Sequence, residues 1–168
     1  MADPTFEELA MPLFDALYNY ARWLAHEPAE AEDLVQETFL KGCRGFGSFA
    51  PGTNFKAWMF RILRNTFLSS RSGLRAAPSL SIDDEGDEAK RIADDSPTAE
   101  TLLIQRADGQ RLQEAIEQLP IPFREVLLLG DVEELSYKEI AETLSIPVGT
   151  VTSRLLRARR KVREALTK

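Results

Sequence analysis

The sequence contains one cysteine and one histidine, and this scarcity excludes several classes of function. Cys43 has no second cysteine to pair with, so an internal disulfide and a cysteine-rich metal site are both excluded. A serine-hydrolase triad would depend on His26 alone, and no Gly-x-Ser-x-Gly motif surrounds any serine. A glycine-rich phosphate-binding loop is also missing. The sequence therefore predicts a protein that is not an enzyme and needs no cofactor or metal. His26 itself follows a predicted helix end, where a solvated or C-capping histidine is expected.

Long apolar runs are missing as well. No stretch of eighteen apolar residues occurs, which predicts no membrane insertion. The first residues are acidic and amphipathic, unlike the basic and then apolar pattern of a secretion signal. An apolar fraction of 43% is ordinary for a globular protein and sufficient for a core. We therefore expect a cytoplasmic protein of one domain or two small ones.

Strand-like alternation of apolar and polar residues is not convincing anywhere in the chain, and helical periodicity dominates. The pattern predicts an all-α fold of two small helical domains, 1–71 and 97–168, joined by a flexible linker over 72–96. That linker is poor in large apolar residues and rich in Ser, Gly, Pro and acidic residues. It would let the domains sit together or engage separate sites; the alternative is a plain connector. Helices are predicted over 5–25 with a break at Pro12, and over 29–42, 54–71, 97–118, 121–131, 136–144 and 147–166.

The segment from Ser136 to Arg163 has the pattern of a helix-turn-helix DNA-binding motif. Ser136 and Glu139 have the spacing of a capping box, which marks a helix start. This first helix has a narrow apolar face, formed by Ile140, Ala141 and Leu144. Pro147 suits the first turn of a second helix, because its missing N–H would have no partner there. Two helices joined so closely are typical of this motif.

The second helix of this motif has two different faces. At 100° per residue, one apolar stripe is formed by Val151, Leu155, Ala158, Val162 and Leu166. Roughly opposite lie Ser153, Leu156, Arg157 and Arg160. From Pro147 onward there are seven basic residues against one acidic residue, in a chain whose net charge is −6. A solvated cationic helix would explain these charges, but the cap, the turn and the face together favour DNA contact. Weak binding is expected for this helix alone, so a partner should hold it on DNA.

The predicted helix over 29–42 also has two sides. Its inward arc consists of Ala31, Leu34, Val35, Thr38 and Phe39, and the opposite side carries Asp33, Gln36, Glu37 and Leu40. Acidic and amide groups around an exposed leucine form a plausible protein-docking patch. The alternative is a solvated face on which the following loop covers Leu40.

Aromatic residues are concentrated between Cys43 and Phe67. A Gly-rich loop carries Phe46 and Phe49, which are difficult to bury together in so few residues. The following helix has a predicted apolar arc of Phe55, Trp58, Met59, Ile62, Leu63 and Phe67, with Arg61, Arg64 and Asn65 beyond it. Aromatics interleaved with cations and an amide suit single-stranded nucleic acid. We expect Phe55, Met59 and Ile62 to be core residues, and Phe49 and Asn65 to contact nucleic acid.

Three segments together resemble a known family. AEDLVQETFLK, GTNFKAWMFRILRNTF and LSYKEIAETLSIPVGTVTSRLLRAR are similar, in this order, to bacterial RNA polymerase sigma factors of the extracytoplasmic-function type. The resemblance implies that 1–71 is a sigma-2 domain and 97–168 a sigma-4 domain. The implied partners are core RNA polymerase, through its β′ clamp helices and β flap, promoter DNA and an anti-sigma factor. The loop PGTNFKAW also resembles the subgroup paired with redox-sensing, zinc-containing anti-sigma factors.

The resemblance also implies roles for particular residues. Core-polymerase binding falls on Asp33, Gln36, Glu37 and Leu40. Recognition of the −10 element falls on Phe49, Asn54, Lys56, Arg61, Ile62 and Asn65, with a flipped base near Phe49, Ile62 and Asn65. Recognition of the −35 element falls on Thr152, Ser153, Leu156, Arg157 and Arg160. Thr152 stands where many relatives carry a basic residue, which leaves its base preference open.

Two other functions are compatible with parts of the sequence. A two-domain transcriptional regulator would use the helix-turn-helix and a ligand- or partner-binding N-terminal domain, bind a specific duplex without polymerase and act as a dimer. An enzyme would require a constellation of reactive residues that the sequence does not contain. The sigma-factor prediction accounts for both halves of the chain.

Overall fold

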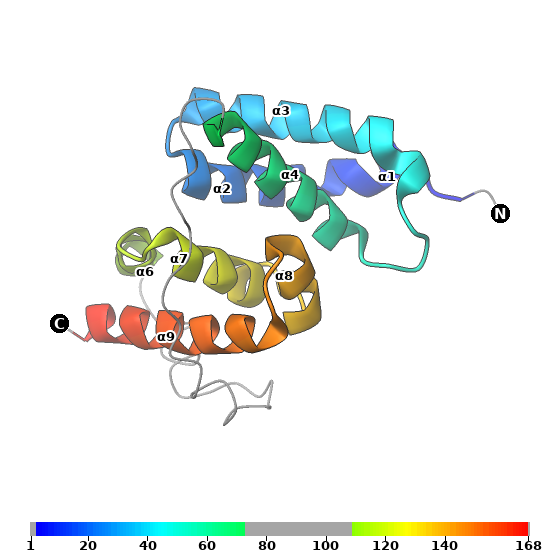
Figure 1. Cartoon of the computed structure of the whole chain (residues 1–168). Helices are drawn as coiled ribbons and strands as arrows, with labels where there is room; N and C mark the ends of the chain where they lie inside the picture. Colours follow the sequence, from blue (N-terminus) through cyan, green and yellow to red (C-terminus); the bar gives the residue numbers. More distant parts are fainter. Residues whose placement is uncertain (1–2, 73–108, 168) are drawn as a thin grey trace. The chain divides into compact units, whose positions relative to one another are not determined.

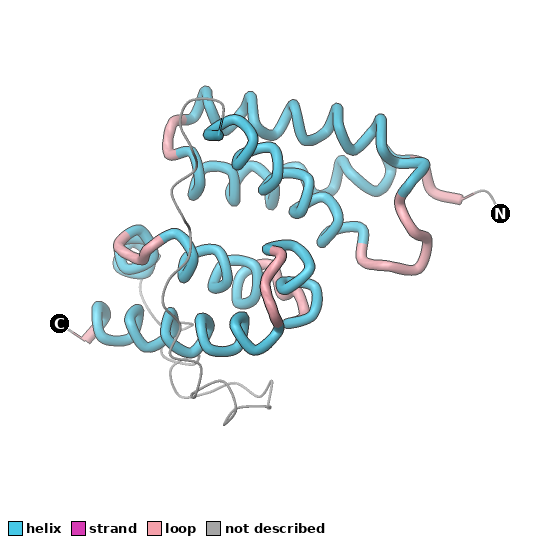
Figure 2. Tube along the Cα trace, viewed as in Figure 1, coloured by secondary structure: helices cyan, strands magenta, loops and turns pink. Residues whose placement is uncertain are grey.

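The computed structural model describes residues 3–72 and 109–167, which form helices connected by short loops (Figures 1 and 2). No strand occurs in these two ranges, as the sequence predicts. The chain divides into two compact units, one built around α1–α4 and the other around α6–α9. The predicted linker 72–96 and the beginning of the predicted helix 97–118 lie almost entirely outside the described residues. None of the described helices is long and apolar enough to cross a membrane.

The N-terminal unit begins with an interrupted helix. α1 (Phe6–Ala10) passes through a 3₁₀ turn (Met11–Leu13) into α2 (Phe14–Ala25). Pro12 stands in that turn, which confirms the predicted break. α2 ends at His26, whose φ of 67° is left-handed and whose N–H donates to the Arg22 carbonyl. His26 is therefore the expected exposed C-cap of this helix.

Two long helices complete this unit, α3 (Pro28–Gly45) and α4 (Phe55–Ser72), and both pack on α2. α3 runs three residues beyond its predicted end because Gly42 lies inside the helix rather than ending it. A Cβ on Gly42 would come within 3.0 Å of both Met59 and Phe6, so this position needs a residue without a side chain. An ion pair between Glu30 and Arg71 (3.0 Å) joins the start of α3 to the end of α4.

The buried face of α4 is rotated about the helix axis relative to the predicted face. Met59, Leu63 and Phe67 are buried as expected, and Phe60, absent from the predicted arc, is fully buried with its ring 5.2 Å from that of Tyr20. Because Phe60 and Thr66 face inward, the buried face of α4 rotates toward them. Phe55, Trp58 and Ile62 consequently lie at its edge and are only half-buried. The prediction that Phe55 and Ile62 are core residues is therefore wrong in its strict form.

The C-terminal unit consists of α6 (Gly109–Glu117), α7 (Ile121–Leu127), α8 (Tyr137–Leu144) and α9 (Val148–Leu166), and α9 packs along α6 and α7. The predicted helix 121–131 changes character, because Leu128–Val132 forms a π-helical turn. Gly130 in this turn is tightly packed against two side chains: a Cβ on it would lie 3.3 Å from both Ile140 and Leu155. The widened turn therefore packs closely on both helices of the motif.

A buried arginine ends α6. The Arg124 guanidinium donates to the carbonyls of Ile116 (3.3 Å), Glu117 (2.6 Å) and Leu119 (3.1 Å), and the residue is only 5% exposed. Burial lowers the pKa of Arg124, while the charges of Glu117 and Glu125 oppose that effect. Arg124 thus replaces the solvent that the last carbonyls of α6 would otherwise need.

Candidate functional site

The helix-turn-helix has the local structure that the sequence predicts. The Ser136 hydroxyl accepts from the Glu139 N–H (3.1 Å), and the Glu139 carboxylate accepts from the Ser136 N–H (2.8 Å), so the capping box is complete. α8 ends at Ser145, a left-handed residue with a φ of 57°. Pro147 is the N-cap residue, so α9 starts one residue later than predicted. The Pro147 carbonyl accepts from the N–H groups of Thr150 and Val151.

The apolar faces of both helices are buried as predicted. Ile140, Ala141 and Leu144 on α8 are at most 7% exposed. On α9 the stripe formed by Val151, Leu155, Ala158, Val162 and Leu166 is buried throughout. Because this stripe is used for packing, the orientation of α9 about its own axis is fixed within the unit.

The candidate −35 residues have different accessibilities. Leu156, Arg157 and Arg160 are partly exposed, while Thr152 and Ser153 are only 8% and 1% exposed. The Thr152 hydroxyl donates to the Val148 carbonyl (3.1 Å) and the Ser153 hydroxyl to the Thr150 carbonyl (3.2 Å). In this structure the two hydroxyls are therefore directed to the backbone of their own helix, and their contact with bases stays a prediction.

One basic residue of α9 has a role that the sequence did not indicate. Arg159 donates to both carboxylate oxygens of Asp131, through Nε (3.0 Å) and Nη2 (2.6 Å), and both side chains are 16% exposed. Burial would lower the pKa of Arg159, but the hydrogen bond and charge of Asp131 outweigh it, and Tyr137 adds to them, so the pKa is raised. Charge counting along the helix cannot find such a pair, because its partner is 28 residues away.

The candidate docking patch on α3 is open. Asp33, Gln36 and Glu37 are exposed and Leu40 is 51% exposed, so the following loop does not cover this leucine. The alternative prediction of a covered Leu40 is therefore wrong.

An aromatic surface lies beside this patch and was missed by the sequence prediction. The Phe14 ring is 43% exposed, stacks on Tyr18 (6.2 Å between centroids) and lies 6.1 Å from the ring of Phe39, the residue before Leu40. The signal that could have revealed it is the spacing of Phe14 and Tyr18, which places two rings on one side of a helix.

Four aromatic rings form a cluster at the start of α4. Phe49 lies 6.1 Å from Phe46, 5.3 Å from Phe55 and 5.2 Å from Trp58, measured between ring centroids. Phe46 and Phe49 stack nearly parallel and are both half-buried. Each ring therefore shields part of the other from solvent. Phe49 therefore stands on a rigid aromatic support.

The other −10 candidates lie on and before α4. Asn54 is exposed and caps the helix, because its side-chain oxygen accepts from the Ala57 N–H (3.3 Å). The turn before it contains Gly52 at a φ of 86°. By helical position, the turned core of α4 places Arg61, Ile62 and Asn65 on one outward side together with Trp58. Arg61 and Asn65 are exposed, and Ile62 and Lys56 are half-buried.

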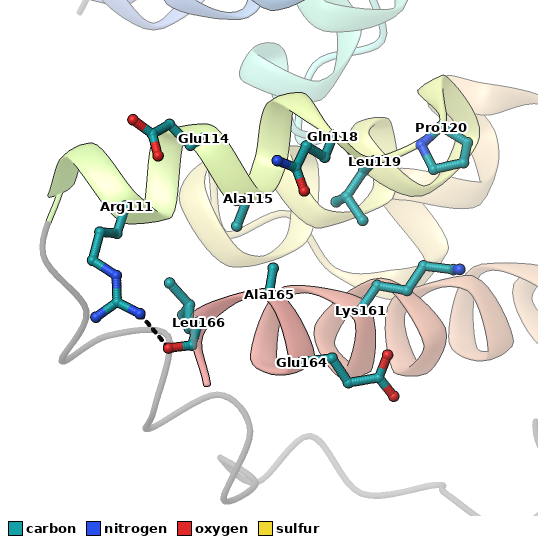
Figure 3. A pocket seen from close by; sticks show the side chains of 10 residues that line it. All are labelled: Arg111, Glu114, Ala115, Gln118, Leu119, Pro120, Lys161, Glu164, Ala165 and Leu166. Atoms are coloured by element: carbon teal, nitrogen blue, oxygen red, sulfur yellow. Dashed lines mark hydrogen bonds between the residues drawn. The ribbon is translucent and has the colours of Figure 1, made fainter. Parts of the chain in front are cut away.

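A groove of about 490 Å³ lies between α6 and the second half of α9 (Figure 3). Arg111 closes one end by donating to the Leu166 carbonyl. The walls combine apolar side chains with charges of both signs and are formed by Arg111, Glu114, Ala115, Gln118, Leu119, Pro120, Lys161, Glu164, Ala165 and Leu166. In residues 3–72 and 109–167, no group of three or more His, Cys, Asp or Glu could hold a metal ion.

Comparison with known proteins relates both units to one family. Residues 9–76 match the model described as Sigma-70 region 2, and residues 109–162 match Sigma-70, region 4. The RNA polymerase sigma-H factor of Pseudomonas aeruginosa is 34% identical over 148 residues, which cover 84% of this chain and 75% of that protein. The ECF RNA polymerase sigma factor EcfG of Rhodopseudomonas palustris is 34% identical over 163 residues, covering 90% and 86%.

Two further relatives extend the comparison. The ECF RNA polymerase sigma factor SigE of Mycolicibacterium smegmatis is 35% identical over 167 residues, and the match spans 99% of this chain and 63% of that protein. The sigma factor RpoE of Bartonella quintana, solved in complex with the anti-sigma factor NepR, has a TM-score of 0.71 at 30% identity and 96% coverage of both chains.

Proposed function

Because the chain belongs to the sigma-70 family and to its extracytoplasmic-function group, we propose that it is a promoter-specificity subunit of RNA polymerase. It binds core polymerase, directs it to promoters with particular −10 and −35 elements, and promotes opening of the DNA. The observation that carries this function is the presence, in one chain, of a region 2 unit with an exposed docking patch and a region 4 unit with a helix-turn-helix. A protein of this kind acts by binding rather than by catalysis, in the cytoplasm where polymerase works.

The docking patch on α3 is the proposed site for the β′ clamp helices. Its support is the open position of Leu40 among Asp33, Gln36 and Glu37. Exposed apolar groups rimmed by polar ones are typical of protein interfaces. The neighbouring rings of Phe14 and Tyr18 would extend this surface with a flat apolar area.

The aromatic end of α4 is the proposed site of −10 recognition. Phe49 and the outward residues Arg61, Ile62 and Asn65 combine a ring, a cation, an apolar edge and an amide. Stacking and amide hydrogen bonds hold an unpaired base, while cations hold phosphate. These contacts offset the few kcal/mol typically needed to extrude a base from the duplex. Asn54 and Lys56 lie at the start of the same helix, where we expect them to contact the nucleic-acid backbone beside the unpaired base.

The two ends of α9 have separate proposed roles. The part from Thr152 to Arg160, with Thr152, Ser153, Leu156, Arg157 and Arg160, enters the major groove at the −35 element. The C-terminal end of α9 borders the groove with α6, which we propose receives the polymerase β flap. Replacing both Lys161 and Glu164 by Ala should weaken binding of core polymerase and leave −35 selection unchanged; unchanged core affinity would reject the groove as the flap site.

The proposed regulator is an anti-sigma factor, as in the Bartonella complex. We further propose that it belongs to the zinc-containing, redox-sensing group, on the sequence of the segment from Pro51 to Trp58, which forms the turn before α4 and its first residues. Affinity capture of the inhibitor with this chain, followed by zinc analysis and titration with diamide, tests this assignment. A captured inhibitor without zinc, or one that diamide does not release, would reject it.

The decisive experiment is reconstituted transcription with purified core polymerase, with and without this chain. The template is a promoter selected by the resulting holoenzyme from a randomised duplex pool. We expect core binding and specific initiation only when the chain is present. If the chain binds a specific duplex without polymerase and gives no initiation, the function is that of a simple helix-turn-helix regulator.

A further inference from the structure

Asp131 and Arg159 connect the π-helical turn to the recognition helix. The carboxylate accepts two hydrogen bonds from one guanidinium, at 3.0 and 2.6 Å, and each side chain is 16% exposed. Bidentate pairs of this type fix direction as well as distance, because two parallel bonds resist rotation about either one. The pair therefore restrains α9 against turning and sliding relative to Leu128–Val132.

The same junction is restrained from two other directions. Gly130, the residue before Asp131, packs so tightly that a Cβ would lie 3.3 Å from Ile140 of α8 and from Leu155 of α9. Tyr137, the first residue of α8, interacts electrostatically with Arg159. Arg159 thus lies where the π-helical turn and both helices of the motif meet.

Arg159 is also next to the side of α9 that is assigned to DNA. By helical position it lies between the buried stripe and Leu156, and it directly precedes Arg160. A small rotation of α9 would shift Leu156, Arg157 and Arg160 together. An unpaired guanidinium at this position could reach a phosphate, whereas a guanidinium held by Asp131 has its Nε and Nη2 directed to that carboxylate and its charge balanced there.

We infer that Asp131 is a positioning residue for −35 recognition: it holds Arg159, sets the rotation of α9 and keeps one cation of that helix from binding DNA non-specifically. This inference rests on the proposed role of α9 in promoter recognition. Asp131 itself touches no base. Its effect on DNA binding passes through Arg159.

The test is a double-mutant cycle of D131N, R159Q and D131N/R159Q in holoenzyme assembled from full-length chain and core polymerase. Affinity is measured for a duplex selected by wild-type holoenzyme from a randomised pool, and for the same duplex with its −35 bases shuffled. We expect D131N to reduce the ratio of the two affinities about tenfold, comparable to losing one base contact. Its binding to the shuffled duplex should also become steeper in salt, by about 0.9 in the logarithmic slope, because Arg159 gains a phosphate.

The cycle separates positioning from mere stability. In the R159Q background, D131N should change neither the salt slope nor the affinity ratio further. A purely structural pair would lower the melting temperature of D131N and leave both DNA readouts at their wild-type values, and this result would overturn the inference. E134Q, which removes an exposed carboxylate three residues after Asp131, controls for the change in net charge. If D131N does not fold, D131E is measured in its place, because it keeps the negative charge. For the inference to stand, the affinity ratio of D131E must then be higher than that of R159Q.

Failure of the proposed function gives a different result. If wild-type holoenzyme selects no sequence from the pool, promoter recognition itself is wrong. If it selects a sequence and D131N discriminates as well as wild type, only the role of Asp131 is wrong.

Discussion

Gly42 of α3 lies against Met59 of α4 so closely that a Cβ atom on Gly42 would come within 2.9 Å of the Met59 sulfur. The same Cβ would come within 2.9 Å of the Phe6 ring. Met59 is fully buried, and the half-buried Phe6 ring packs against those of Phe39, Phe46 and Phe55, so a Cβ on Gly42 would have to displace packed side chains.

G42A should therefore lower the free energy of unfolding of the N-terminal unit by up to about 2 kcal/mol, since overpacking typically costs about 1–3 kcal/mol. The loss is expected even though alanine is the better helix former, which by itself would contribute about 1 kcal/mol in the opposite direction. Urea unfolding followed by circular dichroism measures the change. G47A is the matched control, because a Cβ there meets nothing within 4 Å, and equal effects of the two substitutions would refute close packing as the cause.

Ser145 adopts a left-handed conformation between the two helices of the DNA-binding motif. Replacing it with Gly removes the steric cost of a Cβ in this region, so S145G should stabilise the C-terminal unit by about 0.5–1 kcal/mol. Thermal unfolding gives the measurement. S145A keeps the Cβ and should give no gain, and a similar gain from both variants would contradict the conformational explanation.

Arg124 donates to two carbonyl groups at the end of α6 and to one just after it. R124M preserves much of the volume but leaves the buried carbonyls of Glu117 and Leu119 without this donor, which should cost about 2–4 kcal/mol of stability; the Ile116 carbonyl keeps the Leu119 N–H (3.0 Å). The expected observation is a lower unfolding midpoint for the C-terminal unit in urea. R111M, at an exposed position with one carbonyl partner, should cost clearly less. Equal losses would mean that the three-carbonyl cap contributes no more than one surface contact.

Arg157 tests the proposed −35 contact. If it makes a bidentate contact to a base, R157A should weaken promoter binding by about 1–3 kcal/mol and relax the preference at one position. Binding of holoenzyme to single-base variants of the selected duplex measures both effects. K161A removes a cation from the groove side of the same helix and should leave the base preference unchanged. A uniform weakening over all sequences by R157A would reassign Arg157 to phosphate binding.

Asn65 tests the proposed −10 contact. N65A should reduce promoter opening, detected by permanganate reactivity of unpaired thymines, while core polymerase is bound as tightly as by wild type. N19A, an exposed asparagine on α2, is the matched control and should not affect opening. Loss of core affinity in N65A would instead indicate a structural role for this side chain.

Sequence periodicity predicted the helices well because each one has an apolar stripe that only a helix can bury. The capping box at Ser136, the break at Pro12 and the stripe from Val151 to Leu166 were all found from local patterns. The orientation of α4 about its axis was not found in this way, because Phe60 is buried by packing against Tyr20, a residue 40 positions earlier. The sequence showed Arg159 only as a charge, because its partner lies on another element. Periodicity indicated a DNA-contacting face and a protein-docking patch, but the assignment of residues to the −10 element, the −35 element and core polymerase came from the family resemblance and remains a prediction.

The cap formed by Arg124 has a consequence for the order in which this region acquires structure. α6 leaves the ribosome before Arg124 does, so the carbonyl of its last residue, Glu117, lacks this donor until α7 has formed and docked. α6 should consequently fray at its end in any nascent chain that stops short of α7. In the complete protein, the amide protons of both helices should exchange together, as one cooperative folding step.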